Sequence, residues 1–492
     1  MSSFRIAAVL MAGAVGVASA QGSEPQTVQS PLTSTNPTNV RDYGATGDGT
    51  TDDTPSLVDV FTNVCASGGG TIYFPSGTYV IDPGSTSIPI CGNLLVQGTG
   101  TLRVKPGSGN YRYIFAANPP DKAVDNLTFT GLTIDQNTMA NATGTISVDD
   151  PRTWQQVWQV FVGTNVHFEN LRLYVCGVNP INVNGPTVSG VYIARNYIVF
   201  QKRPGQPEFD NSTIYIDGDD FHISDNTFTS TLPDAARTAI EVHKGSGSVT
   251  GNTISYYQGG MNLVNLQGAS VTSNNVRDAG QGISLWSSTN MDSVTVQGNT
   301  ISVDQVTRNA PTAWGIATFF LNGLNGSFSN LQISGNVLTF EPESAPRSIA
   351  NWVNYGIGLQ TLGNISNAQV MGNQIINAPV RGITVGVADS RYLTSRVSVR
   401  DNQIVDAGSN FSGGTSDYSA GLALQGNLTS IDVLFNRLDF LSNPMIGQYS
   451  YWSAEYGFSF LDVIVAENYV TAVGRAPVNG LTDSIIQTYP PQ

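Results

Sequence analysis

Two short segments of the chain bring together side chains that could carry out acid–base chemistry. They read IYID and IEVH, and they end at Asp217 and His243. Alternate side chains of a β-strand point to opposite faces, so the Ile and Val residues face one way and the polar residues the other. If the segments are neighbouring parallel strands, Tyr215 lies beside Glu241 and Asp217 beside His243, about 5 Å apart.

These four residues are the predicted catalytic group. The diagonal from Asp217 to Glu241 spans roughly 7–8 Å between backbone positions. That separation suits a carboxylic acid paired with a base or nucleophile across a glycosidic bond. We therefore expect Asp217 and Glu241 to be the two carboxylates, with His243 and Tyr215 in support.

Polar and aromatic residues near this group are candidates for holding a sugar. Charged side chains can bind hydroxyl or carboxylate groups, and indole rings offer flat apolar faces for stacking. The predicted substrate-binding residues are Lys244, Asp219, Asp220, Arg203, Trp286 and Trp314. Trp286 is expected to be exposed and Trp314 to lie in a loop, and Trp158 is expected in another loop. Asn262 and Ser284, which follow Glu241 in the same column, are expected to be ordinary neighbours.

A six-residue phrase recurs along the chain and predicts the elements that carry these residues. It consists of an apolar residue, two others, Asn, one more and an apolar residue. Its Asn residues are Asn196, Asn226, Asn252, Asn274, Asn299, Asn336, Asn373, Asn402, Asn436 and Asn468. The apolar residues alternate with period two, and Gly and Asn interrupt each unit, which argues against a helical repeat. A β-sandwich would also alternate, but it would not place Asn at one fixed point of each unit.

The repeat therefore predicts an all-β fold, a single-stranded right-handed parallel β-helix. Each coil of such a solenoid needs a tight turn, and the recurring Asn is expected to take left-handed backbone geometry there. Stacked coils would place the Asn side chains about 4.7–4.9 Å apart, where their amides can form a ladder. The Val, Ile and Leu residues would form one continuous core.

A different motif opens the chain. It consists of NVRDYGA at 39–45, GDGTTDDT at 47–54 and GGGTIYFPSGTY at 68–79, with a short helix expected over 55–66. This motif resembles the opening of the pectate-lyase-like right-handed β-helix superfamily, in its rhamnogalacturonase/epimerase form. The superfamily includes polygalacturonases, rhamnogalacturonases, fungal exo-glucanases and phage tailspikes. The resemblance implies that the helix caps the open end of the solenoid and that Asp52 and Asp53 are structural.

The resemblance specifies the fold and leaves the reaction open. Polygalacturonase-type hydrolases carry NTD, DD, GHG and RIK signatures, and only the second is similar to anything here, at Asp219 and Asp220. Ordinary pectin hydrolysis is therefore not favoured. The expected function is cleavage of glycosidic bonds in a polysaccharide by a glycoside hydrolase or transglycosidase.

Two alternatives remain open. In a polysaccharide lyase or uronan epimerase, a Tyr, His or Lys would remove the proton next to a uronate carboxyl group, and a cation would neutralise that carboxylate. Tyr215, His243, Lys244 and Arg237 could serve in these roles. Acidic side chains could then hold Ca²⁺, whereas a hydrolase is expected to need no cofactor or metal. The third possibility is a non-catalytic carbohydrate-binding solenoid.

The first residues and the composition predict a secreted protein. Arg5, an apolar run over 6–18 and a small-residue site ending at Ala20 are typical of a signal peptide over 1–20. A net charge of -14, with only 22 Lys and Arg, disfavours nucleic acid or an anionic membrane as partner. We expect a capping region at 21–95, the solenoid at 96–480 and a tail at 481–492. The expected partner is a polysaccharide or oligosaccharide, and a monomer and a homotrimer are equally compatible with the sequence.

Cysteines and glycosylation sequons agree with export. Cys65 and Cys91 are expected to form a disulfide in an oxidising compartment, and Cys176 is expected to be buried. The three cysteines are too few for a metal-binding cysteine cluster. Candidate N-glycosylation sites are Asn126, Asn141, Asn211, Asn325, Asn364, Asn410 and Asn427.

Overall fold

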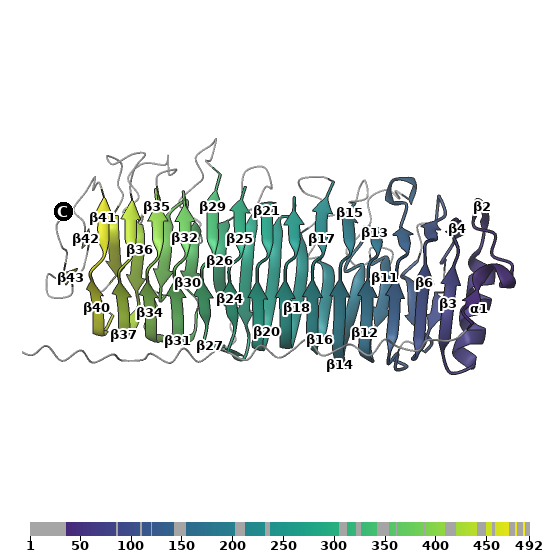
Figure 1. The fold of residues 1–492 in the computed structure, drawn as a ribbon. Helices are drawn as coiled ribbons and strands as arrows, with labels where there is room; N and C mark the ends of the chain where they lie inside the picture. The colour runs from purple at the N-terminus through teal and green to yellow at the C-terminus, as the bar shows by residue number, and fades with distance from the viewer. Residues whose placement is uncertain are drawn as a thin grey trace, which may run out of the picture.

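Parallel strands stack along one axis into an elongated right-handed β-helix, with an α-helix at its N-terminal end (Figure 1). This computed structural model describes residues 36–471 except 85–86, 109–110, 120, 142–153, 202–211, 232–236, 305–311, 321–325, 342–353, 361, 388, 409–419, 440–448 and 455–457, together with 478–479 and 486–487. The described strands form one 28-stranded and one 15-stranded parallel sheet. The predicted fold class is confirmed.

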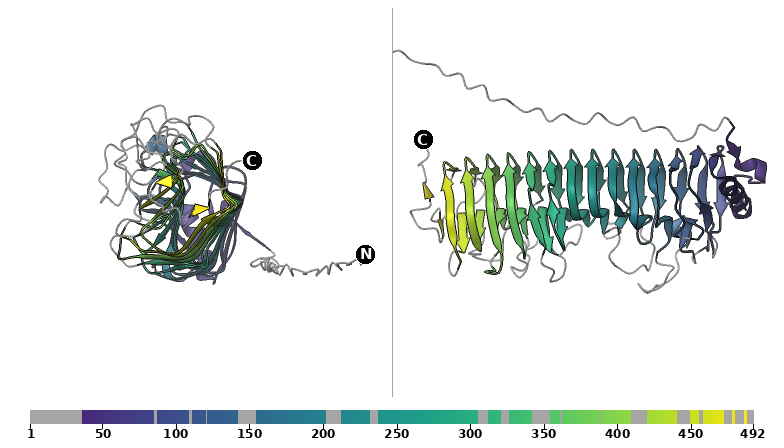
Figure 2. Two further views of the ribbon diagram at one scale, coloured as in Figure 1. Left: turned by 90° about the vertical axis from the view of Figure 1, so that its left-hand side faces the viewer. Right: turned by 90° about the horizontal axis from the view of Figure 1, so that it is seen from below.

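Each coil has three faces, which the end-on view of Figure 2 shows as three walls. In one coil, strand β16 (Ser212–Ser224) forms the first face, bends near Asp220, where φ is 52°, and continues as the second face. Strand β17 (Thr227–Ser230) forms the third face, which belongs to the 15-stranded sheet. The chain then returns to the first face, where the next coil begins.

The next coils repeat this plan and stack on the first in parallel register. Strand β18 (Thr238–Thr250) pairs with β16, and β20 (Gly259–Thr272) pairs with β18. Stacking begins before residue 96, because β3 (Gly70–Phe74) already pairs with β6 (Leu94–Gly98). The predicted start of the solenoid is therefore too late, because the motif that resembles the cap also contains strands of the first coil. The predicted signal peptide lies outside the described residues.

Inward-facing side chains form one continuous core that runs from Val40 to Val465. Aromatic rings fill it in the N-terminal coils. Trp158, in strand β11 (Gln156–Val160), is fully buried, and its ring centroid lies 4.5 Å from that of Phe168. The prediction of a loop for Trp158 is wrong, because Trp158 occupies an inward position of a strand that the repeat did not mark.

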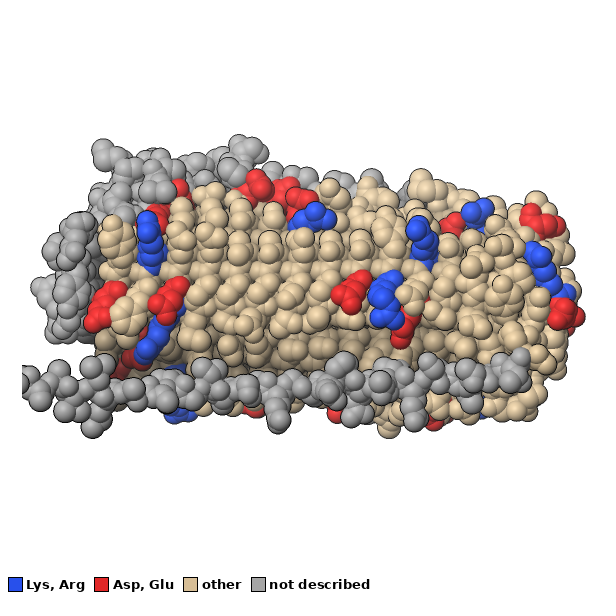
Figure 3. Space-filling view, viewed as in Figure 1, with Lys and Arg blue, Asp and Glu red and all other residues tan. Residues whose placement is uncertain are grey.

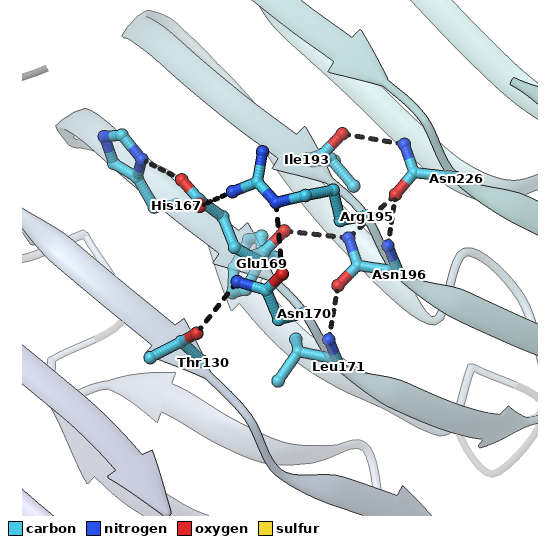
Figure 4. Close-up of polar contacts among 10 residues, drawn as sticks. Thr130, His167, Glu169, Asn170, Leu171, Ile193, Arg195, Asn196 and Asn226 are labelled. Carbon is cyan, nitrogen blue, oxygen red and sulfur yellow. Dashed lines mark hydrogen bonds and ion pairs between the residues drawn. The ribbon is translucent and has the colours of Figure 1, made fainter. Parts of the chain in front are cut away.

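The recurring Asn residues form the predicted ladder inside the turns. Asn252 is fully buried, and its Nδ2 donates to Oδ1 of Asn274 at 3.0 Å and to the carbonyl of Ile223 at 2.9 Å. The same contact joins Asn196 to Asn226 (Figure 4). The residue with left-handed geometry, however, is the one before each Asn, for example Gly251 at φ 66° and Ser273 at φ 56°. The expected backbone role of Asn is therefore wrong, and its amide is what the turn requires.

Replacing Asn252 by Ala is expected to lower the free energy of unfolding by about 2–4 kcal/mol. The substitution leaves several buried ladder groups without a partner, and each such group costs about 1–3 kcal/mol. Denaturant unfolding of the variant checks this value. Half-buried Asn275, one residue beyond the neighbouring ladder position Asn274, is the matched control; equal stabilities of the two Ala variants would contradict the role of the ladder.

Helix α1 (Thr54–Ala66) closes the N-terminal end, as Figure 1 shows. Its buried residues, among them Val60 and Phe61, continue the core. Asp53 is 1% exposed, and its carboxylate accepts the backbone N–H of Thr46 at 2.7 Å, so its structural role is as expected. A disulfide links Cys65, in the helix, to Cys91, as predicted. Cys176 is buried, also as predicted.

The sequons differ in how their amide nitrogens are used. Asn364 is exposed, whereas Asn141 is 2% exposed and Nδ2 of Asn126 donates to Asn93 at 2.9 Å. Nδ2 of Asn427 donates to the carbonyl of Ser390 at 2.8 Å. Because a glycan is attached to Nδ2, the folded chain favours Asn364 over the other three as an acceptor. Asn211, Asn325 and Asn410 lie outside the described residues.

Charged side chains are sparse on the face drawn in Figure 3, where a long uncharged stretch separates small charged groups. This agrees with a content of charged residues of only 12%. No helix of the described ranges has the length and apolarity that crossing a bilayer requires.

Candidate functional site

The register of β16 and β18 brings the predicted catalytic group together on the first face. Tyr215 pairs with Glu241, and Asp217 pairs with His243. The Ile and Val residues between them are fully buried. The four polar side chains therefore project outward from two adjacent strands, as the alternation predicts.

Both carboxylate oxygens of Glu241 are held by hydrogen bonds. Oε1 lies 2.7 Å from Nε2 of His243, and Oε2 accepts a hydrogen bond from the hydroxyl group of Ser212. Nδ1 of His243 lies 3.4 Å from the hydroxyl oxygen of Tyr215. Because Nε2 faces an acceptor, a neutral imidazole carries its proton there and presents Nδ1 to the phenol. Tyr215, His243 and Glu241 thus form a chain along which a proton can move.

Asp217 is engaged separately from Glu241. Its Oδ1 lies 2.8 Å from Nζ of Lys244, whose side chain reaches back from the next strand. Both side chains remain partly exposed, so the ion pair adds little to stability and acts mainly by placing a positive charge beside Asp217. The two carboxylates therefore have different surroundings: an ammonium group at Asp217, and an imidazole and a hydroxyl group at Glu241.

A groove with a volume of about 410 Å³ adjoins Glu241 and His243 on the side of the later coils. Trp286 and Trp314 line it, together with neutral amide and hydroxyl side chains and Arg237. Tyr215, Asp217 and Lys244 are not among its lining residues. Tyr215 and Asp217 lie on β16, the strand before that of Glu241, and Lys244 follows His243 on β18. Aromatic walls beside a few placed polar groups are typical of ligand sites.

Packing fixes the two indole rings. Trp286, in β22 (Gln281–Ser287), is half-buried and stacks on Phe319 with ring centroids 4.6 Å apart. Trp314, in β26 (Ala313–Phe320), is 7% exposed, and its indole N–H donates to Oγ of Ser284 at 3.0 Å. The loop predicted for Trp314 is wrong, because the ring packs into a cluster with Phe319 and Tyr355 on a strand.

The family model described as rhamnogalacturonase A/epimerase, pectate lyase-like, matches residues 37–284, half of the chain. The chain belongs to this family. The matched region contains the cap and all four residues of the predicted catalytic group. The predicted superfamily is thereby confirmed, and the protein is a β-helix of a carbohydrate-active family.

Individual relatives resemble this chain either over short stretches of sequence or in fold. The mannuronan C5-epimerase AlgE3 of Azotobacter vinelandii is 38% identical over 66 residues, which are 13% of this chain and 4% of that protein. The chain thus spans only a small part of the curated relatives that it matches. The surface adhesin PfbA of Streptococcus pneumoniae aligns over 85% of this chain and 94% of its own, with 17% identity and a TM-score of 0.56. The tailspike protein of E. coli bacteriophage HK620, solved with a pentasaccharide, aligns over 90% and 80%, with 13% identity and a TM-score of 0.56. These two structures show the fold alone.

In the present chain, Asp219 and Asp220, in the turn after Asp217, have structural partners. Asp219 accepts hydrogen bonds from the backbone N–H and the hydroxyl group of Ser246, and the N–H of Ser246 holds the pKa of Asp219 below its usual range. Asp220 lies 3.1 Å from Nε2 of His222, on the second face. The substrate-binding role of Asp219, Asp220 and Lys244 stays a prediction. Arg203 lies outside the described residues.

A second polar cluster lies on the second face of the earlier coils (Figure 4). Nδ1 of His167 lies 2.8 Å from Glu169, and Arg195 pairs with the same carboxylate. The hydrogen bond from His167, together with Arg195, lowers the pKa of Glu169 despite its burial. The His167 side chain is only 3% exposed, so the cluster is structural. Among the residues with described positions, no group of three or more His, Cys, Asp or Glu is suited to hold a metal ion.

Several residues of the site escaped the sequence analysis, and three of them show why. Ser212 lies two residues before inward-facing Ile214, so the alternation of side chains places Ser212 on the inward side. The alternation therefore does not reveal its contact with Glu241. Asn262 and Ser284 follow in the column of Glu241, but Asn262 lines the groove and Ser284 holds Trp314. They are not the ordinary neighbours expected. The available signal was that Asn262 and Ser284 share the column of Glu241. It was overlooked because Asn and Ser are common residue types.

Proposed function

We propose that the protein is a secreted enzyme that cleaves glycosidic bonds in a polysaccharide by carboxylate acid–base catalysis. One observation carries the proposal: Glu241 is the one carboxylate among the described lining residues of the groove, and both its oxygens are held in place. A sugar ring stacked on Trp286 would lie in the same groove. Family membership supports a carbohydrate substrate, and the predicted signal peptide supports export.

In this scheme, Glu241 protonates the leaving glycosidic oxygen and Asp217 supplies the second carboxylate. Their diagonal positions on adjacent strands are roughly 7–8 Å apart between backbone atoms. In such a pair, one carboxyl group acts as acid while the other attacks the anomeric carbon or activates water. Lys244 keeps a positive charge beside Asp217, the base or nucleophile of the scheme.

A polysaccharide lyase or uronan epimerase is the second candidate. It is favoured by the contact between His243 and the hydroxyl group of Tyr215, which couples a phenol to an imidazole held by Glu241. Such a pair can remove a proton next to a carboxylate, and Arg237 in the groove lining could bind that carboxylate. The short match to a mannuronan C5-epimerase supports the same candidate.

A screen of neutral and acidic polysaccharides with two readouts tests the proposal. A hydrolase releases reducing ends without ultraviolet absorbance, which is the expected result. Absorbance from unsaturated sugar ends identifies a lyase instead, and a changed uronate configuration in the NMR spectrum without cleavage identifies an epimerase. Binding without any turnover contradicts both enzyme assignments and supports a carbohydrate-binding solenoid.

Replacing Ser212 by Ala is expected to lower kcat about 10-fold with little change in KM. The loss of its hydroxyl group leaves Oε2 of Glu241 without its donor, so the carboxylate is less well oriented. Ser212→Thr, which keeps the hydroxyl group, is the matched control. An unchanged kcat in Ser212→Ala would show that the contact has no part in the reaction.

A further inference from the structure

The groove extends beyond Glu241 along the later coils, where particular side chains form its walls. Asn262 follows Glu241 in register, one strand further along. Gln281 lies at the start of β22, and Trp286 lies at the other end of the same strand. All three residues line the groove. This part of the groove therefore combines two amide side chains with an indole ring.

Neighbouring threonines contact both amides, and one of them fixes the direction of Gln281. Nε2 of Gln281 donates to the carbonyl oxygen of Thr312 at 3.3 Å and to its Oγ1 at 3.1 Å. A carbonyl oxygen only accepts, so the amide cannot turn around, and Oε1 of Gln281 stays directed away from Thr312 as an acceptor. Nδ2 of Asn262 donates to Oγ1 of Thr238 at 3.2 Å, and in this arrangement Oδ1 is an acceptor. The amide wall thus offers mainly oxygen acceptors.

The indole ring is equally fixed. Trp286 stacks on Phe319 with an angle of 27° between the rings, and Phe319 in turn contacts Trp314 at 4.7 Å between centroids. Trp314 is anchored by Ser284. The half-buried ring of Trp286 therefore keeps its orientation when a ligand enters, and a preorganised flat apolar surface binds a ring at little entropic cost.

We propose that Asn262, Gln281 and Trp286 form a subsite for an uncharged, hydroxyl-bearing sugar, next to the bond that Glu241 acts on. Sugar hydroxyl groups donate to the acceptor oxygens of Asn262 and Gln281, and the apolar face of the ring packs on Trp286. A uronate carboxylate next to Asn262 and Gln281 would meet these oxygens and the carboxylate of Glu241, which disfavours it there, although Arg237 also lines the groove. The inference rests on the proposed function and names the substrate class of its groove.

Direct binding measurements test the subsite apart from turnover. Labelled gluco-, xylo-, manno- and galacto-oligosaccharides are compared with oligogalacturonates and oligomannuronates of the same length, on the full chain carrying Glu241→Gln so that no ligand is consumed. At least one neutral series is expected to bind more tightly than both uronates. Adding Asn262→Ala and Gln281→Ala is expected to weaken its binding about 10-fold or more, since two hydrogen bonds are lost. Gln297→Ala, on an exposed part of the second face, is the matched control.

A charge substitution sharpens the test. Gln281→Lys replaces the acceptor by a cation and is expected to weaken binding of the neutral sugar and to strengthen binding of the uronates. The inference is overturned when no neutral series binds, or when the uronates bind the Glu241→Gln protein more tightly than every neutral series. It is also overturned when binding of the neutral series survives the substitution of both Asn262 and Gln281. Turnover that persists in Glu241→Gln contradicts the proposed function instead, and the binding comparison still decides the subsite.

Discussion

Replacing Glu241 by Gln is expected to lower turnover by about 10²–10⁴-fold, the usual cost of removing a general acid or base. The amide cannot deliver or accept the proton, although it keeps the size of the side chain. Glu241 projects outward from β18, away from the apolar core, so we expect the thermal midpoint to change little. Initial rates on the substrate found in the polysaccharide screen, together with a melting curve, measure both effects.

The matched control for this substitution is Glu467→Gln. Glu467 is an exposed glutamate in a turn of the last coils, far along the solenoid from the groove. It is expected to leave the rate unchanged, and Asp217→Asn is expected to behave like Glu241→Gln. If both carboxylate variants keep the parent rate, the first face of these coils is not the catalytic site.

The fold could be predicted because the repeat and the ladder share one physical cause. A buried amide at every turn imposes Asn at a fixed place, and the apolar pattern on both sides of it sets the strands. The pairing of Tyr215 with Glu241 followed from that pattern alone. The strand register can therefore be predicted from the sequence where the coils are short.

The finer parts of the site could not be predicted, because they depend on contacts across coils. Nothing near Ser212 in the sequence indicates that its hydroxyl group reaches Glu241, 29 positions away. The burial of Trp314 depends on Phe319 and on Tyr355 of the following coil. The contact between the ammonium group of Lys244 and Asp217 was likewise not predicted. Such partners are set by side-chain length and by neighbouring coils, and alternation reports neither.

Replacing His243 by Ala separates the two enzyme candidates. In a hydrolase that uses Glu241 and Asp217, His243 orients Glu241 through the 2.7 Å contact, so we expect a rate loss of about 10-fold and a shifted pH–rate profile. In a lyase or epimerase, His243 accepts the proton of Tyr215 or acts as the base itself, so turnover should fall by about 10²–10⁴-fold. The decisive quantity is the ratio of this loss to the loss in Glu241→Gln.

Tyr215→Phe completes the comparison, because it removes only the hydroxyl group and keeps the ring beside His243. A hydrolase should tolerate this change, since the phenol takes no part in protonating the leaving oxygen. A lyase that uses the phenol as its acid or base should lose as much activity in Tyr215→Phe as in His243→Ala. Near-parent rates in Tyr215→Phe, with deep losses in both carboxylate variants, would leave Glu241 and Asp217 as the residues that make and break the glycosidic bond.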